Sequence, residues 1–260
     1  MDAAGVCLIT GASMGIGAEL AWLFAERGYG LVLVARSQDK LAALAEDIRK
    51  ARSVRVEVIV ADLADPLAPE RIHEEVERLG LVVDVLVNNA GFGTSGDFHR
   101  LPRARELEMV QVNVTSLVGL TQLFLPGMVT RGRGRILNMA STAAFEPGPF
   151  MSTYYASKAF VLSFSEGLAE ELRGSGVSVT CECPGPVATE FLKTAGNGEL
   201  FFFRTFVADA KSVARHAIEA TLRGRAVAIP GFWNKLGALL VRLGPRWLTR
   251  RVLGFLNRYK

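Results

Sequence analysis

The 260-residue sequence contains few residues of the types that build metal centres and disulfide frameworks. Its three cysteines, Cys7, Cys181 and Cys183, are an odd number and lie inside apolar, β-branched runs. This placement predicts buried strand residues in a reducing, cytoplasmic setting, not disulfides or metal ligands. The three histidines show no ligand spacing, so we expect no metal site.

Long apolar segments are also missing. No run of about 18 consecutive apolar residues is present, so we expect no transmembrane helix. The first residues, MDAAGVCLIT, contain no basic segment and lead into a strand-like run, so we expect no signal peptide. Half of all residues are hydrophobic and only 22% are charged, which excludes global disorder and allows a large buried core.

Acidic residues are missing from the end of the chain. From Ala220 onward there are nine Lys and Arg residues and no Asp or Glu. Taking these nine charges from the net charge of +4 leaves −5 for the rest of the chain. The basic character therefore belongs to the tail alone. Because the body has no basic stripe with interleaved aromatic residues, we expect no nucleic-acid partner.

The sequence does contain a regular alternation of short apolar runs and amphipathic stretches. We expect strands at residues 6–10, 31–35, 54–60, 83–87, 135–139, 177–183 and 226–230, and helices at 16–27, 39–51, 66–79, 103–130 and 153–173. The strands are continuously hydrophobic, which is typical of strands buried on both faces. This predicts an α/β fold: one doubly wound, Rossmann-type parallel sheet of about seven strands, with helices on both faces, over residues 1–230.

A glycine-rich turn, Thr10-Gly11-Ala12-Ser13-Met14-Gly15-Ile16-Gly17, joins the first expected strand to the first helix. Gly11 permits a sharp turn, Gly15 lets the backbone approach a phosphate, and Gly17 permits close contact between helix and sheet. The N–H groups of the helix start would then face a pyrophosphate. Glycines also end ordinary strand–helix loops, but the position between the first strand and first helix favours a dinucleotide site.

Four further residues suggest acid–base chemistry. Tyr154 and Lys158 are four residues apart on an expected helix and share one face. A nearby ammonium group lowers the pKa of a tyrosine and so suits it to proton transfer. Ser141 ends the fifth strand, and Asn113 lies on the long helix between strands four and five. Tyr155 is expected to point off the Lys158 face and to take no part.

The spacing TGxxxGxG, the loop Asn88-Asn89-Ala90-Gly91, Asn113, Ser141 and Tyr154-x-x-x-Lys158 resemble the short-chain dehydrogenase/reductase family over about residues 5–190. The resemblance implies an oxidoreductase that interconverts a carbonyl and a secondary alcohol with a nicotinamide cofactor. Tyr154 would be the acid/base, Lys158 would orient the cofactor ribose and tune Tyr154, Ser141 would stabilise the substrate oxygen, and Asn113 would support a proton relay. A homodimer or homotetramer is also implied.

The same resemblance implies a set of cofactor-binding residues. In the family the turn after the sixth strand, which here includes Pro186, holds the nicotinamide carboxamide. The set comprises Gly11, Ser13, Met14, Gly15, Ile16, Gly17, Arg36, Ser37, Asp62, Leu63, Asn89, Ala90, Gly91, Tyr154, Lys158, Pro184, Gly185, Val187 and Thr189.

The end of the second strand bears on the choice of cofactor. NAD-selective folds place a carboxylate there to bind the ribose hydroxyls, and this chain has Ala35-Arg36-Ser37. A guanidinium and a hydroxyl suit a 2′-phosphate, so NADP(H) is favoured over NAD(H). The alternative is that Arg36 is simply solvated at a strand end.

Two segments lie beyond the expected core of the site. Residues 190–212 resemble the family's substrate lid, and their aromatic residues predict either a hydrophobic substrate or packing on the domain or a partner subunit. Residues 231–260 form a basic amphipathic helical tail, with apolar residues at helical spacing on both sides of Gly244-Pro245: Leu236, Leu239, Leu240 and Leu243, then Leu248, Val252, Leu253 and Leu256.

The tail leaves more than one interpretation open. Its apolar faces either pack on the substrate cleft or across a dimer, which we favour, or rest peripherally on a membrane surface that carries anionic lipid. The main functional hypothesis is an NADP(H)-dependent oxidoreductase of a hydrophobic carbonyl/alcohol substrate. The alternatives are a membrane-surface-associated reductase of lipid or acyl substrates and a non-catalytic NADP(H)-binding sensor.

Overall fold

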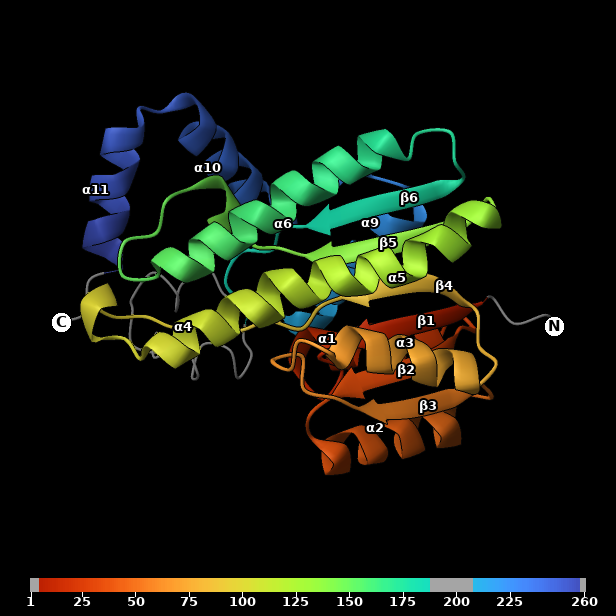
Figure 1. Cartoon of the computed structure of the whole chain (residues 1–260). Coiled ribbons are helices and arrows are strands. Elements are labelled where there is room, and N and C mark those ends of the chain that lie inside the picture. The colour runs from red at the N-terminus through yellow and green to blue at the C-terminus, as the bar shows by residue number, and fades with distance from the viewer. Residues whose placement is uncertain (1–4, 188–207, 258–260) are drawn as a thin grey trace.

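The computed structural model describes residues 5–187 and 208–257 and contains one seven-stranded, all-parallel sheet (Figure 1). The strand order is β3-β2-β1-β4-β5-β6-β7. The strands are β1 (Val6–Thr10), β2 (Gly30–Ala35), β3 (Val56–Val60), β4 (Val83–Asn88), β5 (Gly134–Met139), β6 (Val177–Glu182) and β7 (Val227–Ala228). The predicted doubly wound, Rossmann-type fold is confirmed.

Helices cover both faces of the sheet, because successive strand residues point to opposite sides. Ile9 and Leu33 pack with helices on one face, and Leu8 and Val32 pack with helices on the other. The first face carries α1 (Gly15–Ala25), α2 (Gln38–Ala51) and α9 (Ala210–Leu222). The second carries α3 (Ala68–Arg78), α5 (Ser116–Thr130) and α6 (Ser152–Glu171), with α4 (Arg103–Val110) preceding α5.

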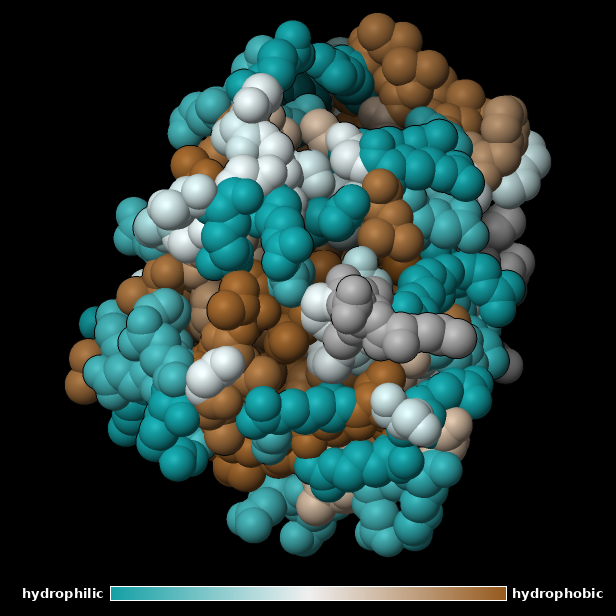
Figure 2. All heavy atoms as spheres, turned by 90° about the vertical axis from the view of Figure 1, so that its right-hand side faces the viewer, coloured by the Kyte–Doolittle hydropathy of each residue, from teal (hydrophilic) through white to brown (hydrophobic). Residues whose placement is uncertain are grey.

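The strand order reverses between β1 and β4, and this position determines where a ligand binds. In open parallel sheets a crevice forms at the carboxyl ends of the strands on either side of such a reversal. Most candidate site residues of the described chain follow strand ends or lie near helix starts on that side, whereas Asn113 lies in the helical stretch between β4 and β5. Figure 2 shows the opposite end, where the strands begin; hydrophilic residues surround a hydrophobic area there.

Several expected elements differ from the observed ones. Helix α9 was not predicted: its first three residues fell within the expected lid, and residues 213–225 were assigned to no element. In the structure it packs against α1. The expected single helix over residues 103–130 contains a π-helical turn at Gln111–Thr115. The third strand begins at Val56 and not at residue 54, and the seventh has two residues.

The stretch Arg103–Thr130 is long and apolar enough to cross a membrane by length and composition. In the structure it is a core element of the domain: Leu117, Leu120 and Phe124 are buried against the sheet and its neighbouring helices. Packing within the fold therefore explains the buried side of this stretch, whereas Leu107, Val110 and Val129 are exposed.

The tail forms the two helices that its sequence pattern predicts. They are α10 (Phe232–Leu243) and α11 (Arg246–Leu256), separated by Gly244 and Pro245. Figure 1 shows both at the end of the sheet where the strands finish, so the tail stands beside the ligand crevice and not on a covering layer of the sheet.

Candidate active site

A cavity of about 890 Å³ opens at the carboxyl ends of the strands. It extends from the glycine turn past Ser141, Tyr154 and Lys158 to the two tail helices. All of the expected cofactor-binding residues line this cavity except Thr189, which lies outside the described residues. Residues 190–207, which make up most of the expected lid, likewise lie outside the described residues. The structure thus brings residues from across the sequence into one continuous space.

The glycine turn after β1 has a shape that side chains would not permit. Gly11 and Gly15 have φ values of +64° and +57°, in the left-handed region that favours glycine. A Cβ atom on Gly17 would lie 2.2 Å from the carbonyl oxygen of Gly11. The start of α1 therefore approaches the end of β1 as closely as the backbone allows, and no side chain caps its first N–H groups within the described residues. This cradle fits the pyrophosphate of a dinucleotide.

Asn89 and Thr10 connect the two strands on either side of the strand-order reversal. The Asn89 side chain donates a hydrogen bond from Nδ2 to the carbonyl oxygen of Thr10, at 2.9 Å. The Thr10 hydroxyl in turn accepts from the backbone N–H groups of Asn89 and Ala90, at 3.0 and 3.1 Å. These bonds fix the NNAG loop against the glycine turn, so the floor of the dinucleotide site is rigid.

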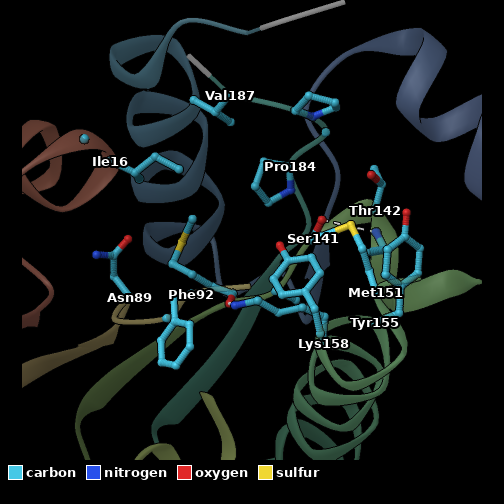
Figure 3. Close-up of a pocket in the computed structure, with 18 of the residues that line it drawn as sticks. Ile16, Asn89, Phe92, Ser141, Thr142, Met151, Tyr155, Lys158, Pro184 and Val187 are labelled. Atoms are coloured by element: carbon cyan, nitrogen blue, oxygen red, sulfur yellow. Dashed lines mark hydrogen bonds between the residues drawn. The ribbon is translucent and has the colours of Figure 1, made fainter. Parts of the chain in front are cut away.

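Ser141, Tyr154 and Lys158 all line this cavity, and Figure 3 shows Ser141 and Lys158 within it. Ser141 and Tyr154 share a side-chain hydrogen bond. The Lys158 Nζ atom donates to the carbonyl oxygen of Met139, at 2.8 Å, and lies 5.9 Å from the centre of the Tyr154 ring. Both Tyr154 and Lys158 are buried, although α6 begins only two residues before Tyr154.

Burial is the largest influence on the pKa values of Tyr154 and Lys158. Desolvation raises the pKa of Tyr154 well above its ordinary value, and the hydrogen bond with Ser141 acts in the opposite, lowering direction. Desolvation lowers the pKa of Lys158 to about 8. We expected Lys158 to lower the pKa of Tyr154; in the structure burial is the largest influence on that pKa, and the lowering influence comes from Ser141. Tyr154 is therefore protonated at neutral pH and able to donate a proton.

Asn113 lies in the π-helical turn between α4 and α5, and π turns of this kind often mark functional positions. Its Oδ1 accepts from the N–H of Phe92, at 3.0 Å, and its Nδ2 donates to the Phe92 carbonyl, at 2.9 Å, and to the Ser157 hydroxyl, at 3.0 Å. These bonds hold the loop after β4 against α6. Asn113 is thus a positioning residue in this structure, and its expected role in a water relay stays a prediction.

The cofactor-selecting end of the cavity lies beside β2. Arg36 is largely exposed, and its Nη1 atom lies 3.9 Å from carboxylate oxygens of both Asp62 and Glu108. These weak, solvent-screened contacts leave the guanidinium available to a ligand. Lys40, on the first turns of α2, also lines the cavity. Sequence reasoning missed it, although it lies four residues after Arg36.

The structure contradicts the expectation that Tyr155 points off the Lys158 face; that it takes no part in the chemistry stays a prediction. Tyr155 is buried, lines the cavity and stands beside Met151 and Thr142 in Figure 3. The spacing explains the error: Tyr155 and Lys158 are three residues apart, and residues at i and i+3 share a helix face just as those at i and i+4 do. Burial raises the pKa of Tyr155 to about 12, so its hydroxyl is protonated at neutral pH.

Sequence reasoning also missed much of the outer wall of the cavity. Glu146 lines it, and burial raises the pKa of this carboxyl to about 7. The tail adds apolar side chains to this wall, in line with packing on the substrate cleft, one of the two packings favoured from its pattern: Leu240, Val241, Leu248, Val252, Leu253 and Leu256. A Cβ on Gly185 would lie 2.6 Å from Asn234 Oδ1, so α10 lies directly on the turn after β6.

Comparison with known families gives one clear match. The model of the short chain dehydrogenase family matches residues 5–200. The chain is 39% identical over 178 residues to a very-long-chain 3-oxoacyl-CoA reductase of Pyrenophora tritici-repentis, which covers 67% of this chain and 52% of that protein. It is 38% identical over 188 residues to human 17-beta-hydroxysteroid dehydrogenase type 3, with 72% and 60% covered. The chain thus spans about half to three fifths of these relatives.

Solved structures share the fold over most of their length. A short-chain dehydrogenase from Sphingobium yanoikuyae in complex with NADPH has a TM-score of 0.82 and 35% identity, covering 90% of this chain and 93% of that one. The bulky-bulky ketone specific alcohol dehydrogenase from Comamonas testosteroni has a TM-score of 0.78 and 32% identity, with 89% and 90% covered. A Burkholderia phymatum member in complex with NAD has a TM-score of 0.82 and 25% identity, with 92% of each chain covered.

Proposed function

The chain belongs to the short-chain dehydrogenase family, and on this basis we propose that it transfers hydride between NADP(H) and the carbonyl/alcohol pair of a bulky hydrophobic substrate. One observation carries the proposal. A single cavity joins the glycine turn, the buried group of Ser141, Tyr154 and Lys158, and the apolar walls of the tail. A cofactor at one end and an apolar substrate at the other would meet at Tyr154.

The chemistry follows from the protonation states at this point. When bound, the nicotinamide cofactor supplies the hydride in reduction and accepts it in oxidation. Tyr154, kept protonated by burial, gives its hydroxyl proton to the carbonyl oxygen during reduction and takes the alcohol proton in the reverse direction. Ser141 holds the substrate oxygen beside that hydroxyl. The Lys158 ammonium stabilises the phenolate that forms and would hold the cofactor ribose.

The cofactor preference rests on the residues beside the end of β2. Arg36, Ser37 and Lys40 line the cavity there, and none of the three is acidic. Their donors suit the three oxygens of a 2′-phosphate through charge-assisted hydrogen bonds. Relatives of known structure bind NADPH in one case and NAD in another, so this local chemistry, and not family membership, is the basis of the preference.

The substrate class rests on the apolar wall that α10 and α11 add to the cavity. Leucine and valine side chains with few polar atoms favour a large apolar molecule with one reactive oxygen. The names of the relatives point the same way: very-long-chain 3-oxoacyl-CoA, 17-beta-hydroxysteroid and bulky-bulky ketone. We infer a ketone or secondary alcohol with a large apolar group on each side, or on one side.

Two further properties belong to the proposal. We infer a homodimer or homotetramer, supported by the exposed apolar residues Leu107, Val110 and Phe160 on the packed helices α4 and α6. We also infer a cytoplasmic setting, supported by three cysteines that are free and buried in the structure.

The proposal is tested by offering the purified chain NADPH or NADH with carbonyl compounds of increasing size. The panel contains acetone, aryl ketones, 17-ketosteroids and 3-oxoacyl thioesters, and oxidation of the cofactor is followed by absorbance. Turnover that rises with apolar bulk supports the proposal. Tight NADPH binding without turnover of any carbonyl or alcohol would instead favour the non-catalytic sensor, a function that the buried Tyr154 and Lys158 argue against.

A further inference from the structure

The two tail helices have an outer face that the cavity does not use. It is defined by Phe232, Leu239 and Leu243 of α10 and by Trp247 and Phe255 of α11, none of which lines the cavity. These five side chains are between 52% and 81% exposed. Phe232, Leu239 and Leu243 are spaced by whole helical turns, so they form one row along α10.

Five cations lie on the same two helices, away from the cavity: Lys235, Arg242, Arg246, Arg250 and Arg251. No acidic residue follows Glu219 in the sequence. Among the described residues none of the five forms an ion pair, and the Arg251 guanidinium lies 5.5 Å from the centre of the Trp247 ring. The outer face therefore combines exposed apolar side chains with positively charged side chains and has no negatively charged ones.

We propose that this outer face docks on a lipid bilayer that contains anionic headgroups. A bilayer can bind both the apolar and the charged side chains of this face. The exposed Phe, Leu and Trp side chains would enter the boundary between headgroups and acyl chains, while Lys and Arg would remain among the negatively charged headgroups. A nucleic acid would meet the cations but leave Leu239 and Leu243 in water. A two-fold contact with a second copy would place the five cations of each tail against those of the other.

Docking would also orient the enzyme. The inner faces of α10 and α11 line the cavity while their outer faces would contact the bilayer, so the tail would form a thin wall between membrane and active site. Figure 1 shows both helices at the end of the molecule where the strands finish. An apolar carbonyl compound dissolved in the bilayer would then reach Tyr154 along an apolar path. This last step rests on the proposed function, whereas the docking itself does not.

The test measures binding of the full chain to vesicles, without substrate or cofactor. Vesicles of phosphatidylcholine mixed with phosphatidylglycerol are compared with vesicles of phosphatidylcholine alone, by co-sedimentation at low and high salt. The test variant is the double substitution Leu243→Glu/Phe255→Glu. The matched control is Leu67→Glu/Val82→Glu, which adds the same charge at two exposed apolar positions outside the tail.

We expect the wild type and the control to bind the anionic vesicles, and high salt to weaken that binding. The test variant should bind at least about tenfold more weakly, because it loses two apolar contacts and gains two repelled charges. Unchanged melting temperatures would show that all chains are folded. Failure of the wild type to bind, or equal binding by the test variant, would overturn the proposal. So would dissociation of a wild-type oligomer by the test variant alone, which would identify the face as a subunit interface.

The two proposals fail in different ways. If the chain binds vesicles but turns over no carbonyl compound, the docking surface stands and the enzymatic proposal falls. If the chain reduces bulky ketones but does not bind vesicles, the enzymatic proposal stands and the docking proposal falls. Turnover of an apolar ketone supplied in anionic vesicles should fall about tenfold in the test variant, while turnover of a water-soluble ketone should not change.

Discussion

The Nδ2 atom of Asn257, at the end of α11, donates a hydrogen bond to the carbonyl oxygen of Pro149, at 3.2 Å, and lies 3.5 Å from the Tyr155 hydroxyl. Asn257 is buried, and one turn earlier a Cβ on Gly254 would lie in ordinary van der Waals contact with the Pro149 ring, at 3.6 Å. The tail is thus fastened to the segment that leads into α6. A polar contact holds the outer wall of the cavity in place.

Removing this fastening should affect substrate binding more than chemistry. In Asn257→Ala the Pro149 carbonyl loses its donor and α11 is held by apolar contacts alone. We expect KM for a bulky ketone to rise by about three- to tenfold, since a net hydrogen bond contributes about 1 kcal/mol, with kcat and the Kd for NADPH little changed. The control is Arg250→Ala, outside the cavity on the same helix. An unchanged KM would show that the hydrogen bond from Asn257 to Pro149 is not needed to hold α11 against the cavity.

The neighbouring tyrosines of α6 allow a matched test of the acid/base. Tyr154→Phe should reduce kcat by at least about 100-fold, because the proton donor is lost while the ring remains. Tyr155→Phe makes the same chemical change one residue away and should keep most of the activity. NADPH binding, followed by fluorescence, should survive in both. If kcat of the Tyr154→Phe variant falls by less than about tenfold, which is equivalent to about 1.4 kcal/mol of activation free energy, Tyr154 is not the acid/base.

Cofactor selectivity should depend on Arg36. Its loose contacts with Asp62 and Glu108 leave the guanidinium free to bind a 2′-phosphate. Arg36→Ala should weaken NADPH binding by about tenfold or more, the value of one charge-assisted hydrogen bond, and should leave NADH binding nearly unchanged. Arg52→Ala, at the other end of α2, serves as the control. Titration calorimetry measures both affinities. Tighter binding of NADH than of NADPH by the wild type would refute the preference.

The proposed assembly should depend on the exposed side of α6. Phe160 is 43% exposed, and its ring stacks on that of Phe164 with centres 5.9 Å apart. In an oligomer this stacked pair would be covered, so Phe160→Glu should lower the mass measured by light scattering at micromolar concentration. Leu67→Glu, at an exposed apolar position on another face, should not. A monomeric wild type under the same conditions would count against the assembly.

The elements that could be predicted from the sequence are those that depend on a pattern within one short segment of the chain. Strands β1 and β2 are nearly continuous apolar runs, β4 and β5 are mostly apolar, and the pairing of Tyr154 with Lys158 is set by helical spacing. Helix α9 was missed because its N-terminus, capped by Asp209, follows a segment that resembles a lid. Its buried residues, which include Val213, Ala214 and Ile218, pack on α1 and on strands β5 and β6, and these are contacts between elements far apart in the sequence.

The outer part of the site could not be predicted for a different reason. Glu146, Tyr155 and the tail come together through long-range packing, and no spacing within one element links them. The amphipathic pattern of residues 231–256 predicted two helices but left open what each face contacts. The structure shows that the inner face lines the cavity, and it leaves the outer face exposed.

A buried pair behind the active site links stability to pH. Glu182, at the end of β6, is fully buried, and its Oε1 lies 2.8 Å from Nδ1 of His216 on α9. Burial raises the pKa of Glu182 to about 9, with a smaller contribution from Cys181. Burial, followed by the charges of Lys235 and Arg225, lowers the pKa of His216. At neutral pH the pair is therefore a hydrogen bond between two neutral groups and not an ion pair.

The direction of the pH dependence follows from these shifts. Between about pH 4.5 and 9 the unfolded chain has released the Glu182 proton that the folded chain keeps, so the free energy of unfolding falls as pH rises. For one group the slope is at most about 1.4 kcal/mol per pH unit. His216 has the opposite effect, because its folded pKa is lowered, but only below its ordinary value of 6.5. Glu182 therefore dominates this pair above that pH.

Glu182→Gln isolates the effect, because glutamine keeps a hydrogen-bonding side chain of the same size beside His216 and cannot titrate. Urea unfolding between about pH 6.5 and 9 should show a falling free energy for the wild type and a flatter profile for the variant, which gains relative stability as pH rises. Glu74→Gln, at an exposed position on α3, removes one carboxylate without burial and should follow the wild-type profile. A wild-type profile that is level or rises with pH would mean that Glu182 is already ionised in the folded protein. It would then be a true ion pair with His216, and its replacement by glutamine would destabilise the fold throughout this range.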